Sequence, residues 1–173
     1  MKLAVLVLTV LLGFTAVACQ KDSTTSAAGP ETGQPLEIDT HECSACGMVV
    51  REQPAPRGQA IHRDGTREFF CSIADLVHYS RTPSPHGSIT HVFLETLDPA
   101  VDPMIPDASA RPWTTPEQAK FVVDVARPGV MGKPVLVYDA RADVGVVTAE
   151  HGGRAVTWEE VEAHVLGPVS AAA

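Results

Sequence analysis

The sequence predicts an α+β fold of two small, similar ββαβ units in tandem, preceded by a disordered tether. Short β-prone apolar runs and helical runs follow the same order in residues 39–97 and again in residues 117–168. Residues 98–116 between them contain five prolines and no apolar periodicity, which indicates a linker. Residues 19–38 are rich in Ser, Thr, Gly, Pro and Ala, a composition typical of a flexible segment without a core.

Residues 1–18 have the features of a secretory signal peptide. Lys2 supplies a positive charge, Leu3–Phe14 form an apolar stretch, and Ala18 precedes a cysteine. The apolar stretch is shorter than the roughly 20 residues that a transmembrane helix needs. The order resembles a bacterial lipobox, so Cys19 is the predicted site of lipidation; the alternative is a secreted protein in which Cys19 is a free thiol.

This N-terminus predicts that the mature chain lies on the periplasmic side of a bacterial membrane and is held there by its lipid. Gln20 follows the lipidated cysteine in place of the Asp that commonly retains lipoproteins at the inner membrane, which favours the outer membrane. Removal of residues 1–18 takes away Lys2 and leaves 155 residues with 12 basic and 21 acidic side chains, a formal net charge of −9 instead of −8. This acidic balance argues against a nucleic-acid partner.

The first unit is expected to contain strands at Met48–Val50, Gln59–Arg63, Glu68–Phe70 and Thr90–Leu94, and a helix at Ile73–Tyr79. Asp64-Gly65 lies between two extended runs and predicts a hairpin turn. Ser72 is the expected N-cap of the helix, with Asp75 three residues later in a capping-box-like position.

The second unit is expected to contain strands at Phe121–Val125, Pro134–Tyr138 and Ala155–Thr157, and helices at Ala140–Ala149 and Trp158–Leu166. Thr157 and Glu160 have the spacing of a capping box at the start of the last helix. The order of elements is therefore similar to that of the first unit.

The cysteines restrict the chemistry of the chain. Once Cys19 is lipidated, Cys43, Cys46 and Cys71 make an odd number, which excludes a complete disulfide framework. Cys43 and Cys46 form a Cys-x-x-Cys pair, which suits half of a zinc site, a redox pair or two packed cysteines. A structural zinc site usually needs a second ligand pair at similar spacing, and this sequence has none. A redox pair should lie at the start of a helix, but the residues after Cys46 are the β-prone Gly-Met-Val-Val.

The order Cys46-Gly47-Met48 favours Cu(I) as the bound metal ion. In an extended backbone residues i and i+2 project from one face, so a thiolate and a thioether would converge while Gly47 leaves room for the ion. Both ligands are soft, and such ligands select Cu(I). A third ligand is expected; Met131, in a glycine-flanked loop, is the leading candidate, and Met104 is the competing one.

Two of the seven histidines are candidate additional ligands. His41 lies two residues before Cys43, and His151 precedes two glycines that can bring the backbone close to a site. The other five are expected to be surface or loop residues: His62, His78, His86, His91 and His164.

Several of these motifs together resemble one family. They are Cys43-Ser44-Ala45-Cys46-Gly47-Met48, Ala60-Ile61, Asp64-Gly65, Phe70-Cys71-Ser72, Asp75-Leu76 with Tyr79, Met131-Gly132, and His151-Gly152-Gly153 with the following Trp-Glu-Glu-Val helix start. Over most of residues 40–162 this pattern resembles the NosL family of nitrous oxide reductase accessory lipoproteins of denitrification. Val130 stands where Pro is the commoner residue of that family before the Met-Gly pair.

The resemblance implies a lipid-anchored periplasmic Cu(I) carrier built from two ββαβ units, which supplies copper for nitrous oxide reductase. Carried over to this chain, it implies Cys46, Met48 and Met131 as ligands. We therefore expect a non-enzymatic metallochaperone with a copper-receiving protein as its partner, a membrane contact through its lipid, and no small-molecule substrate. The alternatives are a zinc-stabilised, treble-clef-like binding module using Cys43, Cys46 and Cys71, and a thiol–disulfide oxidoreductase using Cys43 and Cys46.

Overall fold

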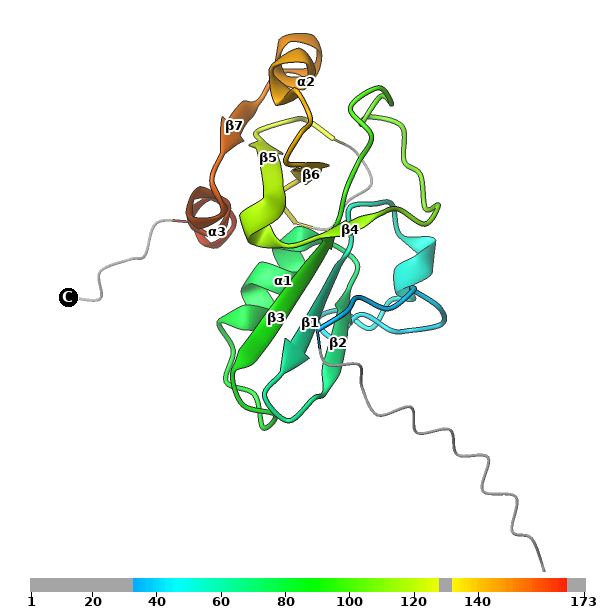
Figure 1. Cartoon of the computed structure of the whole chain (residues 1–173), viewed down its shortest axis with the longest axis vertical. Helices are drawn as coiled ribbons and strands as arrows, with labels where there is room; N and C mark the ends of the chain where they lie inside the picture. The colour runs from blue at the N-terminus through cyan, green and yellow to red at the C-terminus, as the bar shows by residue number, and fades with distance from the viewer. Residues whose placement is uncertain (1–32, 128–131, 168–173) are drawn as a thin grey trace, which may run out of the picture.

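The first unit is a four-stranded antiparallel sheet with a helix on one face. The computed structural model describes residues 33–127 and 132–167. The strands are β1 (Gly58–His62), β2 (Arg67–Phe70), β3 (Ile89–Glu95) and β4 (Trp113–Thr114), and the helix is α1 (Ile73–Ser80). Their order across the sheet is β2-β1-β3-β4, so the first strand of the chain lies in the middle (Figure 1).

The second unit repeats this topology. Its strands are β5 (Ala119–Val123), β6 (Val135–Asp139) and β7 (Arg154–Val156), with α2 (Val144–His151) between the last two. The order β6-β5-β7 is the same second-first-third arrangement as β2-β1-β3, and every pair is antiparallel. The predicted tandem of two ββαβ units is therefore confirmed. A final helix, α3 (Trp158–Leu166), follows the second unit.

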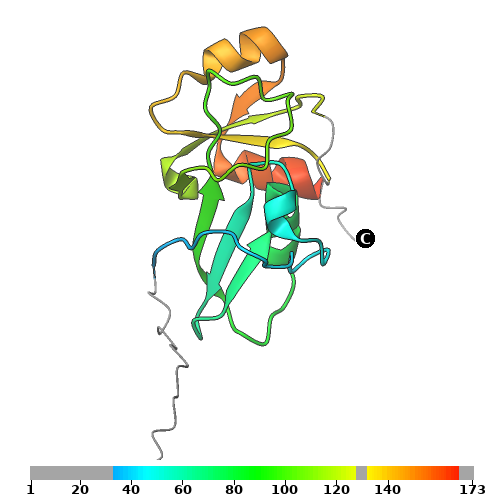
Figure 2. The same cartoon turned by 90° about the vertical axis from the view of Figure 1, so that its right-hand side faces the viewer.

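The two units share one core. The larger buried cluster contains side chains of both, among them Leu76 and Val77 of α1, Phe121 of β5 and Val161 of α3. Helices α1 and α3 contact each other, and Figure 2 shows the red α3 on the side of the second sheet that faces the first unit, with the orange α2 on the outer side. A smaller cluster that includes Val147 lies beneath α2.

Most predicted elements are confirmed to within two residues, and the predicted helix caps are present. The Ser72 side chain accepts a hydrogen bond from the Asp75 backbone N–H, and Thr157 with Glu160 forms the expected capping box. The Asp64 side chain accepts from the Thr66 backbone N–H at 2.9 Å in the turn between β1 and β2. Polar side chains therefore set these boundaries as local sequence rules predict.

Two predicted elements differ from the structure. Residues Met48–Val50 form no strand: Val49 makes one isolated bridge with Glu42, and a short 3-10 helix, Val50–Glu52, begins immediately afterwards. The helix predicted at Ala140–Ala149 begins at Val144 instead, because Asp139 and Ala142 close a turn after β6 and Asp143 caps the helix.

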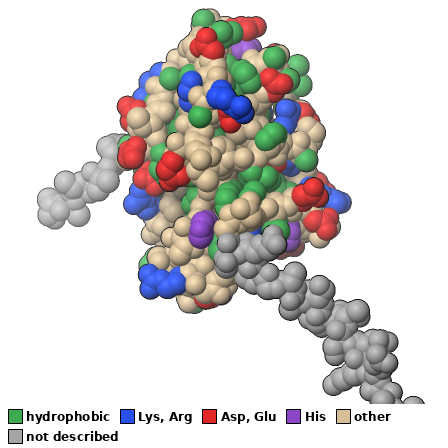
Figure 3. All heavy atoms as spheres, in the orientation of Figure 1, with side chains coloured by type: hydrophobic (Ala, Val, Ile, Leu, Met, Phe, Trp, Pro, Cys, Tyr) green, Lys and Arg blue, Asp and Glu red, His purple; other side chains and the backbone are tan. Residues whose placement is uncertain are grey.

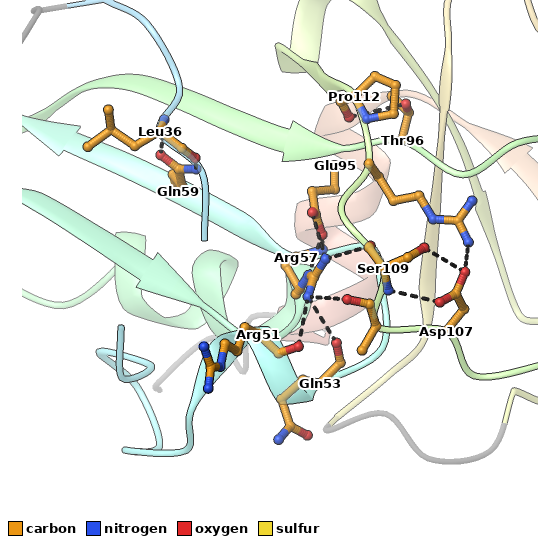
Figure 4. Close-up of polar contacts among 12 residues, drawn as sticks. Leu36, Arg51, Gln53, Arg57, Gln59, Glu95, Thr96, Asp107, Ser109 and Pro112 are labelled. Atoms are coloured by element: carbon orange, nitrogen blue, oxygen red, sulfur yellow. Dashed lines mark hydrogen bonds and ion pairs between the residues drawn. The ribbon is translucent and has the colours of Figure 1, made fainter. Parts of the chain in front are cut away.

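Residues 98–116 do more than join the units. A second 3-10 helix, Pro116–Gln118, follows β4 at the end of this segment. The Asp107 carbonyl accepts a hydrogen bond from Ala55 N at 3.0 Å, and the carbonyls of Ala108 and Ser109 accept from the buried Arg57 guanidinium (Figure 4).

No helix in the described part of the chain is long and apolar enough to cross a membrane.

Candidate metal centre

The Cys-x-x-Cys motif forms a tight turn. Cys43 N donates to the Met48 carbonyl at 2.8 Å, and Gly47 N donates to the Cys43 carbonyl at 2.7 Å. Gly47 has a φ of +75°, a conformation that favours glycine, and a Cβ at this position would meet nothing within 4 Å. The turn leaves Cys46 exposed and Cys43 buried.

Strand β2 holds this turn in place. Ser44 N donates to the Phe69 carbonyl at 2.9 Å, and Cys43 forms an isolated parallel bridge with Phe69. The His41 ring stacks on the Phe69 ring with centroids 3.8 Å apart and an interplanar angle of 5°. These contacts bring the turn to the end of β2, where Cys71 follows.

Cys71 lies at the junction between β2 and α1. Its thiol donates to Asp75 Oδ2 at 3.0 Å, and the Ser72 hydroxyl donates to the same oxygen at 3.0 Å. In return the Ser72 oxygen accepts from Asp75 N at 3.0 Å. The helix cap therefore also fixes a carboxylate beside the buried thiol.

Four side chains converge at this point. One ligand atom from each of Cys43, Cys46, Cys71 and Asp75 lies within 4.8 Å of the others. The Sγ atoms of Cys46 and Cys71 are 3.4 Å apart, and all three described cysteines are free. Three sulfurs form a soft ligand set that suits Cu(I), and the added carboxylate gives a four-atom set that Zn²⁺ accepts as well.

The thiols of the cluster differ in acidity. The Cys71 side chain and then the Cys71 backbone N–H lower the pKa of Cys43 to about 5 against the opposing effect of burial. The same interaction with Cys43, burial and the nearby Asp75 carboxylate raise the pKa of Cys71. Partial desolvation of the sulfur raises the pKa of Cys46, although the residue as a whole is exposed. Cys43 is thus the most acidic thiol of the three, and metal binding at the other two would release protons.

The structure brings together the three cysteines that the sequence marked as candidates and adds Asp75. The capping-box spacing placed Asp75 in the first turn of the helix but did not identify it as a ligand; its place in the turn that starts directly after Cys71 and the N-cap Ser72 is the signal that would have found it. Met48 is half-buried and packs against the larger core cluster. Because Gly47 is left-handed, the extended backbone assumed for residues 46–48 is absent, and Met48 as a ligand stays a prediction.

The remaining predicted residues lie elsewhere or outside the described residues. Met131 and Cys19 belong to the undescribed residues. Gly132, which follows Met131, has a φ of +70° and lies against α1: a Cβ there would stand 3.0 Å from the Ala74 Cβ. Met104 packs against the smaller core cluster.

Neither candidate histidine joins the cluster. The His151 ring lies beside Asp102, with Nδ1 3.7 Å from Oδ1, and beside Glu150. His41 contacts Phe69 through its ring face. Within the described residues the group of converging ligands consists of the three cysteines and Asp75, so both histidines as ligands stay predictions.

The chain is similar to known proteins over most of its length. The family model described as NosL matches residues 35–166. Two relatives named "Copper-binding lipoprotein NosL" are each 26% identical to this chain: the protein of Stutzerimonas stutzeri, with 92% of this chain and 80% of that protein covered, and the protein of Achromobacter cycloclastes, with 88% and 77% covered. The crystal structure of the copper chaperone NosL from Shewanella denitrificans matches with a TM-score of 0.60 and 26% identity, over 73% of this chain and 94% of that chain.

Proposed function

Because the chain belongs to the NosL family, we propose that it is a lipid-anchored, non-enzymatic metallochaperone of the bacterial periplasm whose cargo is Cu(I). The observation that carries this proposal is the convergence of the Cys43, Cys46 and Cys71 sulfurs beside Asp75. Two relatives of this chain are named copper-binding lipoproteins. Thiolate sulfur is the ligand class that selects Cu(I) over Mg²⁺ or Ca²⁺.

The exposure of Cys46 supports transfer of the ion. Cys43 and Cys71 are buried, whereas Cys46 lies at the surface in the turn. An incoming Cys, Met or His of a partner can approach the ion from the Cys46 side and replace one sulfur at a time. Such stepwise exchange lets a soft ion pass between proteins without being released to solvent.

Two methionines would complete the ligand set. Met48 follows Cys46 by two residues, and Gly132, which follows Met131 in the sequence, lies against Ala74 of α1. We propose that Cys46, Met48 and Met131 supply ligands together with the buried thiols. A thioether adds a soft ligand without adding charge.

The proposed partner is a copper-receiving protein, nitrous oxide reductase or its assembly machinery. Membrane contact would be made through the lipid on Cys19, and the outer membrane is favoured by Gln20. On the face shown in Figure 3, acidic and basic side chains of the described residues are intermixed and do not form a basic patch, in keeping with the net negative charge. Neither a nucleic acid nor a small-molecule substrate is proposed.

A zinc-stabilised binding module is the second candidate. The specific observation in its favour is Asp75 Oδ2, which with three sulfurs gives four converging ligand atoms, the number that structural zinc sites use. In that case the metal would hold the Cys43–Met48 turn to α1 and would not be transferred.

Competition titration with a Cu(I) chelator tests the proposal. The protein is the mature chain carrying Cys19→Ser, reduced and kept free of oxygen. One Cu(I) per chain is expected, with affinity lowered at least about 10-fold by Cys46→Ser, Met48→Leu or Met131→Leu, since each removes one soft ligand. Met104→Leu is the matched control, because Met104 packs against the smaller core cluster. If the chain instead binds one Zn²⁺, and still does so in the Met48→Leu and Met131→Leu variants, the zinc module is favoured.

A further inference from the structure

Two sulfurs of the cluster are close enough to react with each other. The Sγ atoms of Cys46 and Cys71 are 3.4 Å apart, and a disulfide bond is about 2.05 Å long. Little more than an ångström of movement therefore separates the two thiols from a covalent bond. Cys46 lies in an exposed turn that can make this movement, whereas Cys71 is held between β2 and α1.

We propose that Cys46 and Cys71 form a reversible disulfide, and that this bond and the bound metal ion exclude each other. The proposal rests on the proposed function, because the excluded ion is the cargo of the cluster. It gives the site a metal-free oxidised state as well as a reduced state that binds metal.

The geometry favours this pair over the Cys-x-x-Cys pair. An external reagent meets the exposed Cys46 first, and Cys71 is the thiol in hydrogen-bond contact with it. The Cys43 sulfur instead accepts the Cys71 backbone N–H at 3.5 Å. The backbone of Cys43 is also fixed on both sides, by Met48 and Gly47 across the turn.

The oxidant in this step is a small-molecule disulfide, RSSR. The Cys46 sulfur attacks one sulfur of RSSR, which forms a mixed disulfide on Cys46 and releases the first RS group. The Cys71 sulfur then attacks Cys46 Sγ, which forms the Cys46–Cys71 bond and releases the second RS group. The two cysteine thiols are oxidised, RSSR is reduced to two RSH molecules, and the two thiol protons end on the released sulfurs.

The bond removes ligands from the metal centre. Thiolate is the form of cysteine that binds metal, and the disulfide leaves neither Cys46 nor Cys71 in that form. A Cu(I) ion would keep Cys43 as its single cysteine ligand, which is too few for competition with other copper sites. Conversely, an ion already bound by both sulfurs would protect them from RSSR.

Mass spectrometry after treatment with oxidised glutathione tests the bond directly. The protein is the reduced, metal-free mature chain carrying Cys19→Ser, held under nitrogen. Trypsin cuts after Arg51, Arg67 and Arg81, so Cys46 and Cys71 fall on different peptides while Cys43 and Cys46 share one. The expected result is a linked pair of peptides joined through Cys46 and Cys71, loss of Cu(I) binding, and recovery of binding after dithiothreitol.

Two variants separate the alternatives. Cys43→Ser should still form the linked pair, whereas Cys71→Ser should instead carry a glutathione adduct on Cys46. A bond within the Cys43–Cys46 peptide, or an unlinked wild-type chain with adducts alone, would overturn the assignment. Unchanged Cu(I) binding after the bond has formed would overturn the mutual exclusion.

The failure of the proposed function gives a different result. If the reduced chain binds no Cu(I) but still forms the Cys46–Cys71 bond, the copper proposal is contradicted and the disulfide is supported. Preloading the reduced chain with Cu(I) before adding oxidised glutathione provides the converse measurement. Bond formation should then slow in proportion to the copper occupancy of the site.

Discussion

Arg57 and Glu95 form a buried ion pair in which two guanidinium nitrogens face two carboxylate oxygens. Nη2 donates to Oε1 at 2.8 Å and Nε donates to Oε2 at 2.5 Å, and both side chains are 2% exposed. Nη1 also donates to the carbonyls of Arg51, Gln53 and Ala108, which share its hydrogens, and Nη2 donates to the Ser109 carbonyl (Figure 4). One side chain thus joins the segment after the cysteine turn to β1, β3 and the loop before β4.

Removal of one partner of this pair should destabilise the protein strongly. Arg57→Met leaves the Glu95 carboxylate buried without its cation, and we expect a loss of about 3–5 kcal/mol in the free energy of unfolding. The double variant Arg57→Met/Glu95→Leu should lose less than Arg57→Met alone, because no uncompensated charge remains. Urea denaturation monitored by circular dichroism measures both, and Arg141→Met, in an exposed pair with Asp139, is the control. Equal losses in single and double variants would contradict this account of the pair.

The two adjacent glycines after α2 should differ in their tolerance of alanine. Both have positive φ, +76° at Gly152 and +83° at Gly153, so each substitution should cost about 1–3 kcal/mol in backbone strain. A Cβ at Gly153 would also stand 2.4 Å from the Val123 carbonyl oxygen, whereas one at Gly152 would meet nothing within 4 Å. Gly153→Ala should therefore lower the free energy of unfolding by about 1–3 kcal/mol more than Gly152→Ala does. Thermal unfolding of the two variants measures the difference. Equal unfolding midpoints would contradict the predicted steric clash at Gly153.

Stability at acid pH should depend on Asp64. The Thr66 backbone N–H and then His86 lower the pKa of Asp64 from 3.8 to about 2. Because the folded-state pKa is the lower one, the stabilisation is present above about pH 4 and disappears as the pH falls towards about 2. The unfolding midpoint of Asp64→Asn should lie below that of the wild type at neutral pH, and the gap should close between these two pH values. A gap that stays constant with pH would refute the role of the carboxylate charge.

Substitution of Asp75 should distinguish the two metals. A carboxylate is a good ligand for Zn²⁺ but a poor one for Cu(I), which prefers sulfur. Asp75→Asn should therefore lower the Zn²⁺ affinity by about 10-fold or more and leave the Cu(I) affinity within about threefold. Asp143→Asn is a matched control, since Asp143 caps α2. Chelator competition with each ion measures both affinities; an equal loss for the two ions would contradict a sulfur-dominated copper site.

The fold was predictable where local signals agree with one another. Ser72, Thr157 and Asp64-Gly65 each act through hydrogen bonds within a few residues, so the helix starts and the hairpin turn follow from the sequence. The shared core and the Arg57–Glu95 pair join residues far apart in the chain. No local pattern encodes such contacts.

The site was predictable in its chemistry more than in its geometry. The sequence identified three cysteines, but an extended path through Gly47 was assumed, and its φ of +75° turns the chain instead. The β-prone residues after it, Met48–Val50, were read as a strand for the same reason. Asp75 joins the sulfurs because Ser72 caps α1 directly after Cys71. The sequence predicted the cap, but not that the cap brings the Asp75 carboxylate to the thiols.

X-ray absorption at the copper edge of the Cu(I)-loaded mature chain tests the central claim most directly, because it reports the atoms bound to the ion. A first shell of sulfur donors is predicted, with at least one sulfur lost in Cys46→Ser and in Cys71→Ser. A shell of nitrogen and oxygen donors, or a sulfur shell unchanged in both variants, would show that the ion is held away from the cysteine cluster and would contradict the account.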